Sequence, residues 1–145
     1  MTPRLKNQYQ SKIISELQKE FSLTNKYMVP KITKVILNMG LGQNANDKKI
    51  LQNCIEDMSL ISGQMPVVTK FKKSISNFKT RQGMAAGVKV TLRKNKMYEF
   101  IDRFINVALP RVRDFRGINP KSFDGNGNYA PVSYTHLTLP TILLV

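Results

Sequence analysis

The amino-acid sequence predicts an α+β protein, with a mixed or antiparallel sheet, helices packed on one of its faces and a long basic loop. Residues 5–21 and 50–61 place apolar side chains at helical spacing. Residues 87–93 alternate between apolar and polar side chains, which is typical of a strand with one buried face. The chain has 145 residues, the size of one domain.

The N-terminal half is expected to contain two helices separated by a strand. The first helix is predicted over residues 4–20, where apolar side chains recur at helical spacing: Leu5, Tyr9, Ile13, Ile14, Leu17 and Phe21. Pro30 interrupts the chain, and the β-branched residues 31–38 predict a strand that ends at Gly40. Asp47 indicates the start of a second helix and Gly63 its end.

The following region is expected to form two strands and a third helix. Residues 67–71 predict a short strand, residues 72–83 a polar basic segment, and residues 87–93 a longer strand. Asn95 is the expected N-cap of the third helix, and Pro110 is expected to stop it. Residues 111–129 are interpreted as irregular chain. Cys54 lies on the apolar stripe of the second helix, which favours packing over a reactive thiol.

Positive charge dominates the chain and is concentrated in its middle. Lys and Arg number 23 against 9 Asp and Glu, a formal net charge of +14. Between Asp57 and Glu99 there is no acid, but there are nine Lys and Arg residues interleaved with Phe71 and Phe78. Cations without nearby acids repel one another, and a polyanion offsets this cost. The pattern favours a nucleic-acid partner over a merely solvated face.

The residue types that catalysis and metal binding require are scarce. His136 is the only histidine and Cys54 the only cysteine, which excludes an internal disulfide framework and a cysteine-cluster zinc site. Gly40 and Gly42 lack the third glycine of a dinucleotide fingerprint and indicate a tight turn. No catalytic residue, metal site or cofactor is therefore predicted. No apolar run reaches the roughly 18 residues of a membrane span, so we expect a cytoplasmic protein with no membrane partner.

Four stretches combine flat rings, amides, hydroxyls and cations, namely Ser62–Pro66, Lys70–Lys73, Asn77–Gly83 and Gly87–Arg93. Rings stack on unpaired bases, amides and hydroxyls reach base edges or a 2′-OH, and cations neutralise phosphate. The sequence therefore predicts an RNA-binding surface.

Six ordered motifs resemble those of the bacterial-type large-subunit ribosomal protein L-five family, the 5S-rRNA-binding ribosomal proteins. They are Asn38–Gly42, Ser62–Pro66, Phe78–Gly83, Lys89–Arg93, Pro110–Gly117 and Ser122–Tyr129. The resemblance covers about residues 3–130, so residues 1–130 are expected to form the 5S-rRNA-binding domain. It implies a non-enzymatic constituent of the large ribosomal subunit that holds 5S rRNA in the central protuberance.

The resemblance also implies site residues. Asn38, Gln64, Phe78 and Thr91 match positions that family members use on 5S rRNA. The two amides would hydrogen-bond, the ring would stack or wedge, and the threonine would bond a backbone or sugar oxygen. Lys70 and Arg93 are predicted phosphate neutralisers on charge alone.

Two further contacts are implied. The loop Lys72–Met84 resembles the segment that reaches the elbow of the P-site tRNA, whose backbone would meet Lys72, Lys73, Lys79 and Arg81. Arg111, Arg113, Asp114 and Arg116 match the part of the family that faces a protein of the small-subunit head and forms an intersubunit bridge. The alternative for these arginines is local tethering of an irregular segment.

The residues alone leave two alternative functions open, each from another functional class. An RNA-modifying enzyme would use the basic face to hold its substrate, but it needs a catalytic constellation. A basic domain that binds nucleic acid or membranes without selectivity needs only the charge.

The last fifteen residues, 131–145, carry no charge in a chain that is 22% charged. The string resembles translated adapter or vector sequence, so we expect an unrelated tail. The family part is then expected to be truncated at its C-terminus, with an unpaired sheet edge. The alternative is a natural C-terminal strand. The ribosome would be cytoplasmic, with an organellar ribosome as the alternative.

Overall fold

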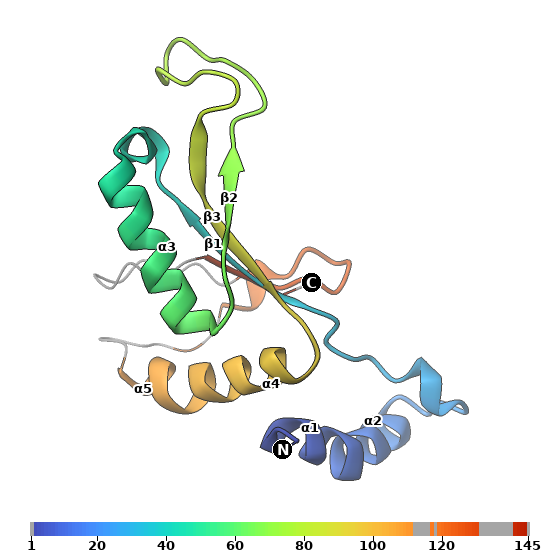
Figure 1. Ribbon diagram of the computed structural model, residues 1–145. Coiled ribbons are helices and arrows are strands. Elements are labelled where there is room, and N and C mark those ends of the chain that lie inside the picture. The colour runs from blue at the N-terminus through green and yellow to red at the C-terminus, as the bar shows by residue number, and fades with distance from the viewer. Residues whose placement is uncertain (1, 112–116, 118, 131–140, 145) are drawn as a thin grey trace. The chain divides into compact units, whose positions relative to one another are not determined.

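A computed structural model describes residues 2–111, 117, 119–130 and 141–144 (Figure 1). The chain divides into two compact units. We call Met1–Lys34 with Arg93–Arg116 the helical unit, and Val35–Leu92 with Gly117–Val145 the sheet unit. Helices and an antiparallel sheet are both present, so the predicted α+β class is confirmed.

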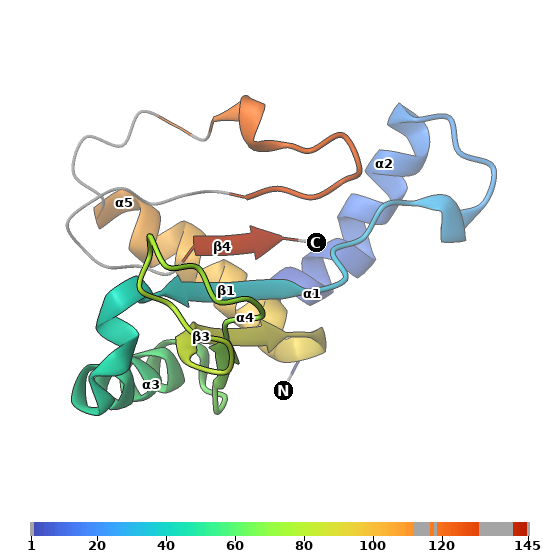
Figure 2. The same ribbon diagram turned by 90° about the horizontal axis from the view of Figure 1, so that it is seen from above.

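The sheet unit contains four strands: β1 (Val35–Gly40), β2 (Val67–Lys70), β3 (Ala85–Leu92) and β4 (Thr141–Leu144). Their order is β2-β3-β1-β4, and every neighbouring pair is antiparallel. Figure 2 shows β3, β1 and β4 side by side. The strand predicted at residues 31–38 instead begins at Val35 and extends to Gly40. This shift arises because β3 ends at Leu92, opposite Val35, and no described strand lies opposite residues 31–34.

The core of the sheet unit lies between one face of the sheet and α3 (Lys48–Ser62), which contacts β3. Both predicted ends of this helix are confirmed: the Asp47 side chain accepts a hydrogen bond from the Lys49 amide at 2.9 Å, and Gly63 adopts a left-handed conformation. The short helix η3 (Gly42–Asn46) precedes it. The fully buried side chains of this core are Val35, Leu37, Met58, Val88, Val90 and Leu92.

Cys54 is half-buried on α3. Burial raises the pKa of its thiol, and the nearby Asp57 carboxylate raises it further. The thiolate is the reactive form of cysteine, so both effects favour the packing role over a nucleophilic one.

The helical unit contains two helical runs. The first comprises α1 (Arg4–Gln8), η1 (Tyr9–Ile13) and α2 (Ile14–Glu20), which confirms the predicted helix over residues 4–20. The second comprises α4 (Lys94–Arg103), η4 (Phe104–Ala108) and α5 (Leu109–Arg111). A short turn of helix, η2 (Lys26–Met28), follows α2. Arg4 forms an ion pair with Asp102 at 2.6 Å, which ties α1 to α4.

Two predictions about the third helix were wrong. Asn95 does not cap it: Arg93 occupies the N-cap position, and the Asn95 side chain accepts a hydrogen bond from Lys6 Nζ at 2.9 Å. Pro110 lies within α5 rather than ending the helix before it. Proline lacks an amide N–H and crowds the carbonyl four residues earlier, and the wider η4 turn precedes it and accommodates this.

The segment after residue 117 contains η5 (Pro120–Ser122) and a small hairpin in which Phe123 pairs with Tyr129. The Asp124 carboxylate accepts hydrogen bonds from Asn126 and Asn128, which lower its pKa. Beyond it, Thr141–Leu144 pairs with β1 as β4, while residues 131–140 lie outside the described residues. The expected unpaired edge is therefore wrong at β1, because β4 pairs with it. An apolar segment of any origin can add to an open strand edge, so the proposal of an unrelated tail stays a prediction.

Candidate nucleic-acid interface

The face of the sheet opposite the buried core carries polar side chains in register. Asn38 of β1 lies directly opposite Lys89 of β3, and Lys89 lies opposite Val67 of β2. All three side chains are exposed. We call this cross-strand set the Asn38–Lys89–Val67 row. It presents an amide, a cation and an apolar surface side by side on a hydrogen-bonded ladder, groups that can contact the base, phosphate and ribose of a nucleotide.

Lys89 was missing from the predicted site residues. Lys89 is one of the nine cations between Asp57 and Glu99, but the sequence does not indicate that it lies opposite Asn38. The alternation of residues 88–92 was a usable signal, because it places Lys89 and Thr91 on the face opposite Val88 and Val90. The register then supplies what alternation lacks, namely the partner of each residue across the sheet.

Two of the predicted 5S rRNA residues, Gln64 and Thr91, are brought together in the sheet unit. The Gln64 side-chain nitrogen donates a hydrogen bond to the Thr91 backbone oxygen at 3.2 Å. The Ser62 hydroxyl, at the end of α3, lies within hydrogen-bonding distance of the backbone oxygens of Met58, at 2.7 Å, and Gln64, at 2.9 Å. Gln64 therefore also has a structural role, in addition to any contact through its amide oxygen.

The close approach of β1 and β3 beside the row depends on Gly87. A Cβ atom added at Gly87 would lie 2.2 Å from the Met39 carbonyl oxygen, whereas one added at its partner Gly40 would meet nothing within 4 Å. The backbone of β1 thus occupies the space that a side chain at residue 87 would need, and this sets the spacing of the strands that carry Asn38 and Lys89.

The long basic loop between β2 and β3 is an ordered hairpin, which projects from these strands in Figure 1. The Phe71 amide donates to the Met84 oxygen at 2.9 Å, and Ile75 pairs with Thr80 through two backbone hydrogen bonds of 3.2 Å. At the turn, the Lys79 amide donates to the Ser76 oxygen and Lys79 has φ of +51°. We call residues 72–84 the hairpin tip.

The hairpin tip presents a ring among cations. The Phe78 side chain is 63% exposed at the turn. The four cations predicted to contact tRNA are also exposed and belong to this segment: Lys72, Lys73, Lys79 and Arg81. The predicted 5S residue Phe78 thus lies with the predicted tRNA residues rather than in the Asn38–Lys89–Val67 row.

The other predicted site residues lie elsewhere. Lys70 is exposed at the end of β2, opposite Ala85. Arg93 is exposed and belongs to the helical unit, directly after β3. Arg111 is exposed at the end of α5, whereas Arg113, Asp114 and Arg116 lie outside the described residues.

Comparisons with known proteins identify the family. The family model described as "Ribosomal protein L5" matches residues 25–81, and the one described as "ribosomal L5P family C-terminus" matches residues 85–143. The chain belongs to the ribosomal protein L5 family. The first match spans Asn38 and most of the hairpin tip, and the second spans Lys89 and Thr91.

Three relatives of this chain carry one and the same name. "Large ribosomal subunit protein uL5" of Dichelobacter nodosus is 56% identical over 139 residues, 96% of this chain and 78% of the relative. The proteins of the same name from Clostridium acetobutylicum and Pelagibacter ubique are 51% and 53% identical over 142 residues. These alignments cover 98% of this chain and 79% and 77% of the two relatives.

Family membership answers the question of enzymatic activity. The relatives are named as ribosomal proteins, so the non-enzymatic prediction is confirmed and the RNA-modifying alternative is set aside. Among the described residues there is no cluster of three or more side chains suited to a metal ion. No helix within the described ranges is long and apolar enough to cross a membrane.

Proposed function

We propose that this ribosomal protein of the large subunit binds 5S rRNA and helps to attach it in the central protuberance. The observation that carries the proposal is the Asn38–Lys89–Val67 row, where the register puts an exposed amide beside an exposed cation on a rigid sheet. The identity of the relatives as large-subunit proteins supports a ribosomal RNA as the partner.

Each side chain of this face has a distinct role. Asn38 donates and accepts hydrogen bonds at a base edge, and Lys89 neutralises the adjacent phosphate. Thr91, two residues along β3 on the same face, bonds a backbone or sugar oxygen. Val67 is 61% exposed and packs against a ribose or a base. Gln64 both holds the end of β3 and offers its amide oxygen to the RNA.

The hairpin tip supplies a second contact. Phe78 stacks or wedges against a base of 5S rRNA, while Lys72, Lys73, Lys79 and Arg81 meet the backbone of the P-site tRNA. The projection of the hairpin tip from β2 and β3 gives its cations the reach that this role requires. Lys70 and Arg93 add phosphate contacts, since both are exposed cations at the ends of the strands.

Two parts of the proposal rest on sequence resemblance alone, the first on resemblance to the family and the second on resemblance to translated adapter or vector sequence. Arg111, Arg113, Asp114 and Arg116 form an intersubunit bridge to a protein of the small-subunit head. The RNA contacts lie within residues 1–130, and residues 131–145 are of unrelated origin. The nucleotide sequence across residue 131 decides this last point, since adapter or vector sequence at the junction is expected.

The test is equilibrium binding of the full chain to 5S rRNA and to an unrelated RNA of similar length, at about 0.15 M salt. We expect a clear preference for 5S rRNA. Lys89→Met is expected to weaken 5S binding about tenfold or more, because a hydrogen bond to a charged group contributes roughly 1.5–3 kcal/mol.

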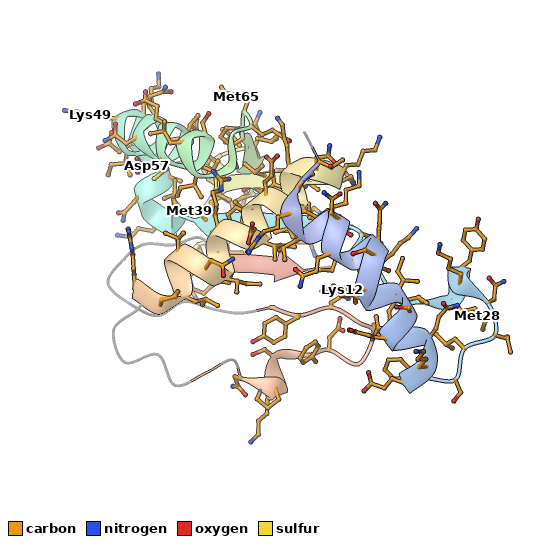
Figure 3. The ribbon with its side chains drawn as sticks, turned by 90° about the horizontal axis from the view of Figure 1, so that it is seen from below. Lys12, Met28, Met39, Lys49, Asp57 and Met65 are labelled. Atoms are coloured by element: carbon orange, nitrogen blue, oxygen red, sulfur yellow. The ribbon has the colours of Figure 1, made fainter. Side chains whose placement is uncertain are left out.

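The matched control is Lys49→Met, which removes the same charge from an exposed position on α3 (Figure 3). Its affinity for 5S rRNA is expected to stay within about twofold of the wild type. Equal losses in the two variants would indicate that net charge alone drives binding. A wild-type chain without preference for 5S rRNA would favour a non-selective basic domain instead.

A further inference from the structure

The helical unit exposes a group of apolar side chains that the proposed function does not use. Between α2 and β1, Tyr27 is 95% exposed, Met28 63%, Phe21 58% and Ile32 42%. Figure 3 shows Met28 on this stretch of chain. Burying such side chains stabilises a fold, and here almost none of that gain is realised for Tyr27. We call residues 21–32 the connecting segment.

The backbone of the connecting segment is held by several hydrogen bonds, although these side chains are exposed. The Asn25 side chain accepts a hydrogen bond from the Tyr27 amide at 2.9 Å, and the Met28 amide donates to the Asn25 oxygen at 3.1 Å. Val29 is buried, and the Tyr9 hydroxyl donates to the Pro30 oxygen at 2.9 Å. The ring of Tyr27 is thus carried on a short helical turn that is fixed on both sides.

Charge around the ring favours an anionic partner. Residues 19–34 contain four lysines and one acid, Glu20. Lys19, Lys26 and Lys31 are exposed, and Lys26 is next to Tyr27 in η2. Apolar side chains alone would suit an apolar protein surface as the partner, whereas a ring flanked by cations suits a nucleic acid.

We infer that the connecting segment is a second RNA contact, in which the ring of Tyr27 stacks on an unpaired base while Lys26 and Lys31 neutralise the flanking phosphates. Met28 packs against the edge of the stacked base. The residues of this contact belong to the helical unit, whereas Asn38, Lys89 and Val67 belong to the sheet unit.

The test is site-specific photocrosslinking of the full chain to an oligouridine of about twelve nucleotides that contains 4-thiouridine, a length within the span of single-strand binding sites. Digestion with trypsin cuts after Lys26 and Lys31, and mass spectrometry then identifies the crosslinked peptide Tyr27–Lys31. We expect this peptide to be crosslinked in the wild type and in Tyr27→Phe, which keeps the ring. In Tyr27→Ala its yield is expected to fall at least about fivefold, because stacking on a ring is lost.

Leu60→Ala is the matched control, since Leu60 is an 82% exposed apolar residue of α3 in the other unit. It is expected to leave the crosslinked peptide unchanged. Absence of the peptide in the wild type, or equal yield in Tyr27→Ala, overturns the inference and leaves a protein as the occupant. Binding of Tyr27→Ala to 5S rRNA is measured in parallel and is expected to match the wild type, so failure of this contact is distinct from failure of 5S binding.

Discussion

The open sheet face and the hairpin tip both present groups that we propose to bind RNA, but they hold them in different ways. On the sheet face, Asn38 and Lys89 are fixed by a ladder of paired strands and by the close approach at Gly87. In the hairpin tip, exposed cations surround Phe78 on a turn held by a few backbone hydrogen bonds. Rigid amides at fixed spacing suit the reading of base edges, whereas long exposed cations suit phosphate contacts that carry no sequence information.

This difference predicts two kinds of mutational effect. Changes on the sheet face should alter selectivity among RNAs, and changes to the cations of the hairpin tip should weaken the binding of all RNAs by the same factor. The largest effect should come from disturbing the ladder itself.

Gly87→Ala should lower the free energy of unfolding by roughly 2–3 kcal/mol, because the new methyl group meets the Met39 carbonyl. Denaturant titration measures this loss. Gly40→Ala is the control at the paired position, where nothing lies within 4 Å, and it should change stability by less than about 1 kcal/mol. Equal stability of the two variants would mean that the pairing of β1 and β3 does not depend on their close approach at Gly87.

Phe78→Ala should weaken 5S rRNA binding by roughly 1–3 kcal/mol, the range for stacking one base on a ring. The side chain is exposed, so stability should change little. Ile75→Ala removes a half-exposed apolar side chain from the same hairpin without removing a ring, and it should bind nearly as the wild type does. An unchanged dissociation constant for Phe78→Ala would remove this residue from the site.

On the ribosome Lys79 is proposed to meet the tRNA backbone, but a phosphate contact carries no sequence information, so in the free protein this cation should also contact the backbone of other bound RNAs. Lys79→Gln should therefore reduce affinity for 5S rRNA and for unrelated RNA by the same factor. The slope of log affinity against log salt should fall by about 1, since one phosphate contact is lost. Lys12→Gln, in the first helical run, is the control with the same charge change and should leave the slope unchanged. A loss confined to 5S rRNA would give the hairpin tip a selective role that we do not expect.

Asp102→Asn should have the smallest effect, and on stability alone. Hydrogen bonding to Arg4 lowers the pKa of Asp102 in the folded chain, so the ion pair stabilises the fold above the ordinary aspartate pKa. This contribution is lost as pH falls through the lowered pKa. The melting temperature of the variant should therefore lie slightly below that of the wild type at neutral pH, and the gap should close in acid. A gap independent of pH would contradict the ion-pair explanation.

The local sequence pattern was sufficient to predict several elements of the fold. Asp47 and Gly63 fix the ends of α3 because capping depends on residues within one turn. Alternation in residues 88–92 predicts which side chains of β3 face the core, because the strand period is two.

Features that depend on distant partners were not predictable. The start of β1 depends on where β3 ends, and the neighbour of Asn38 depends on a register that links strands about fifty residues apart. Asn95 looked like a cap, but Lys6 of a remote helix engages its side chain. The contact between Gln64 and Thr91 likewise joins segments that local sequence does not connect.

The most direct test of the account is the ratio of dissociation constants for unrelated RNA and 5S rRNA, compared between Asn38→Ala and a variant with Lys72, Lys73, Lys79 and Arg81 all changed to Gln. We predict that the ratio falls toward 1 in Asn38→Ala, whereas the fourfold variant keeps the wild-type ratio despite weaker binding. A ratio preserved in Asn38→Ala and abolished in the fourfold variant would contradict the assignment of selectivity to the sheet face.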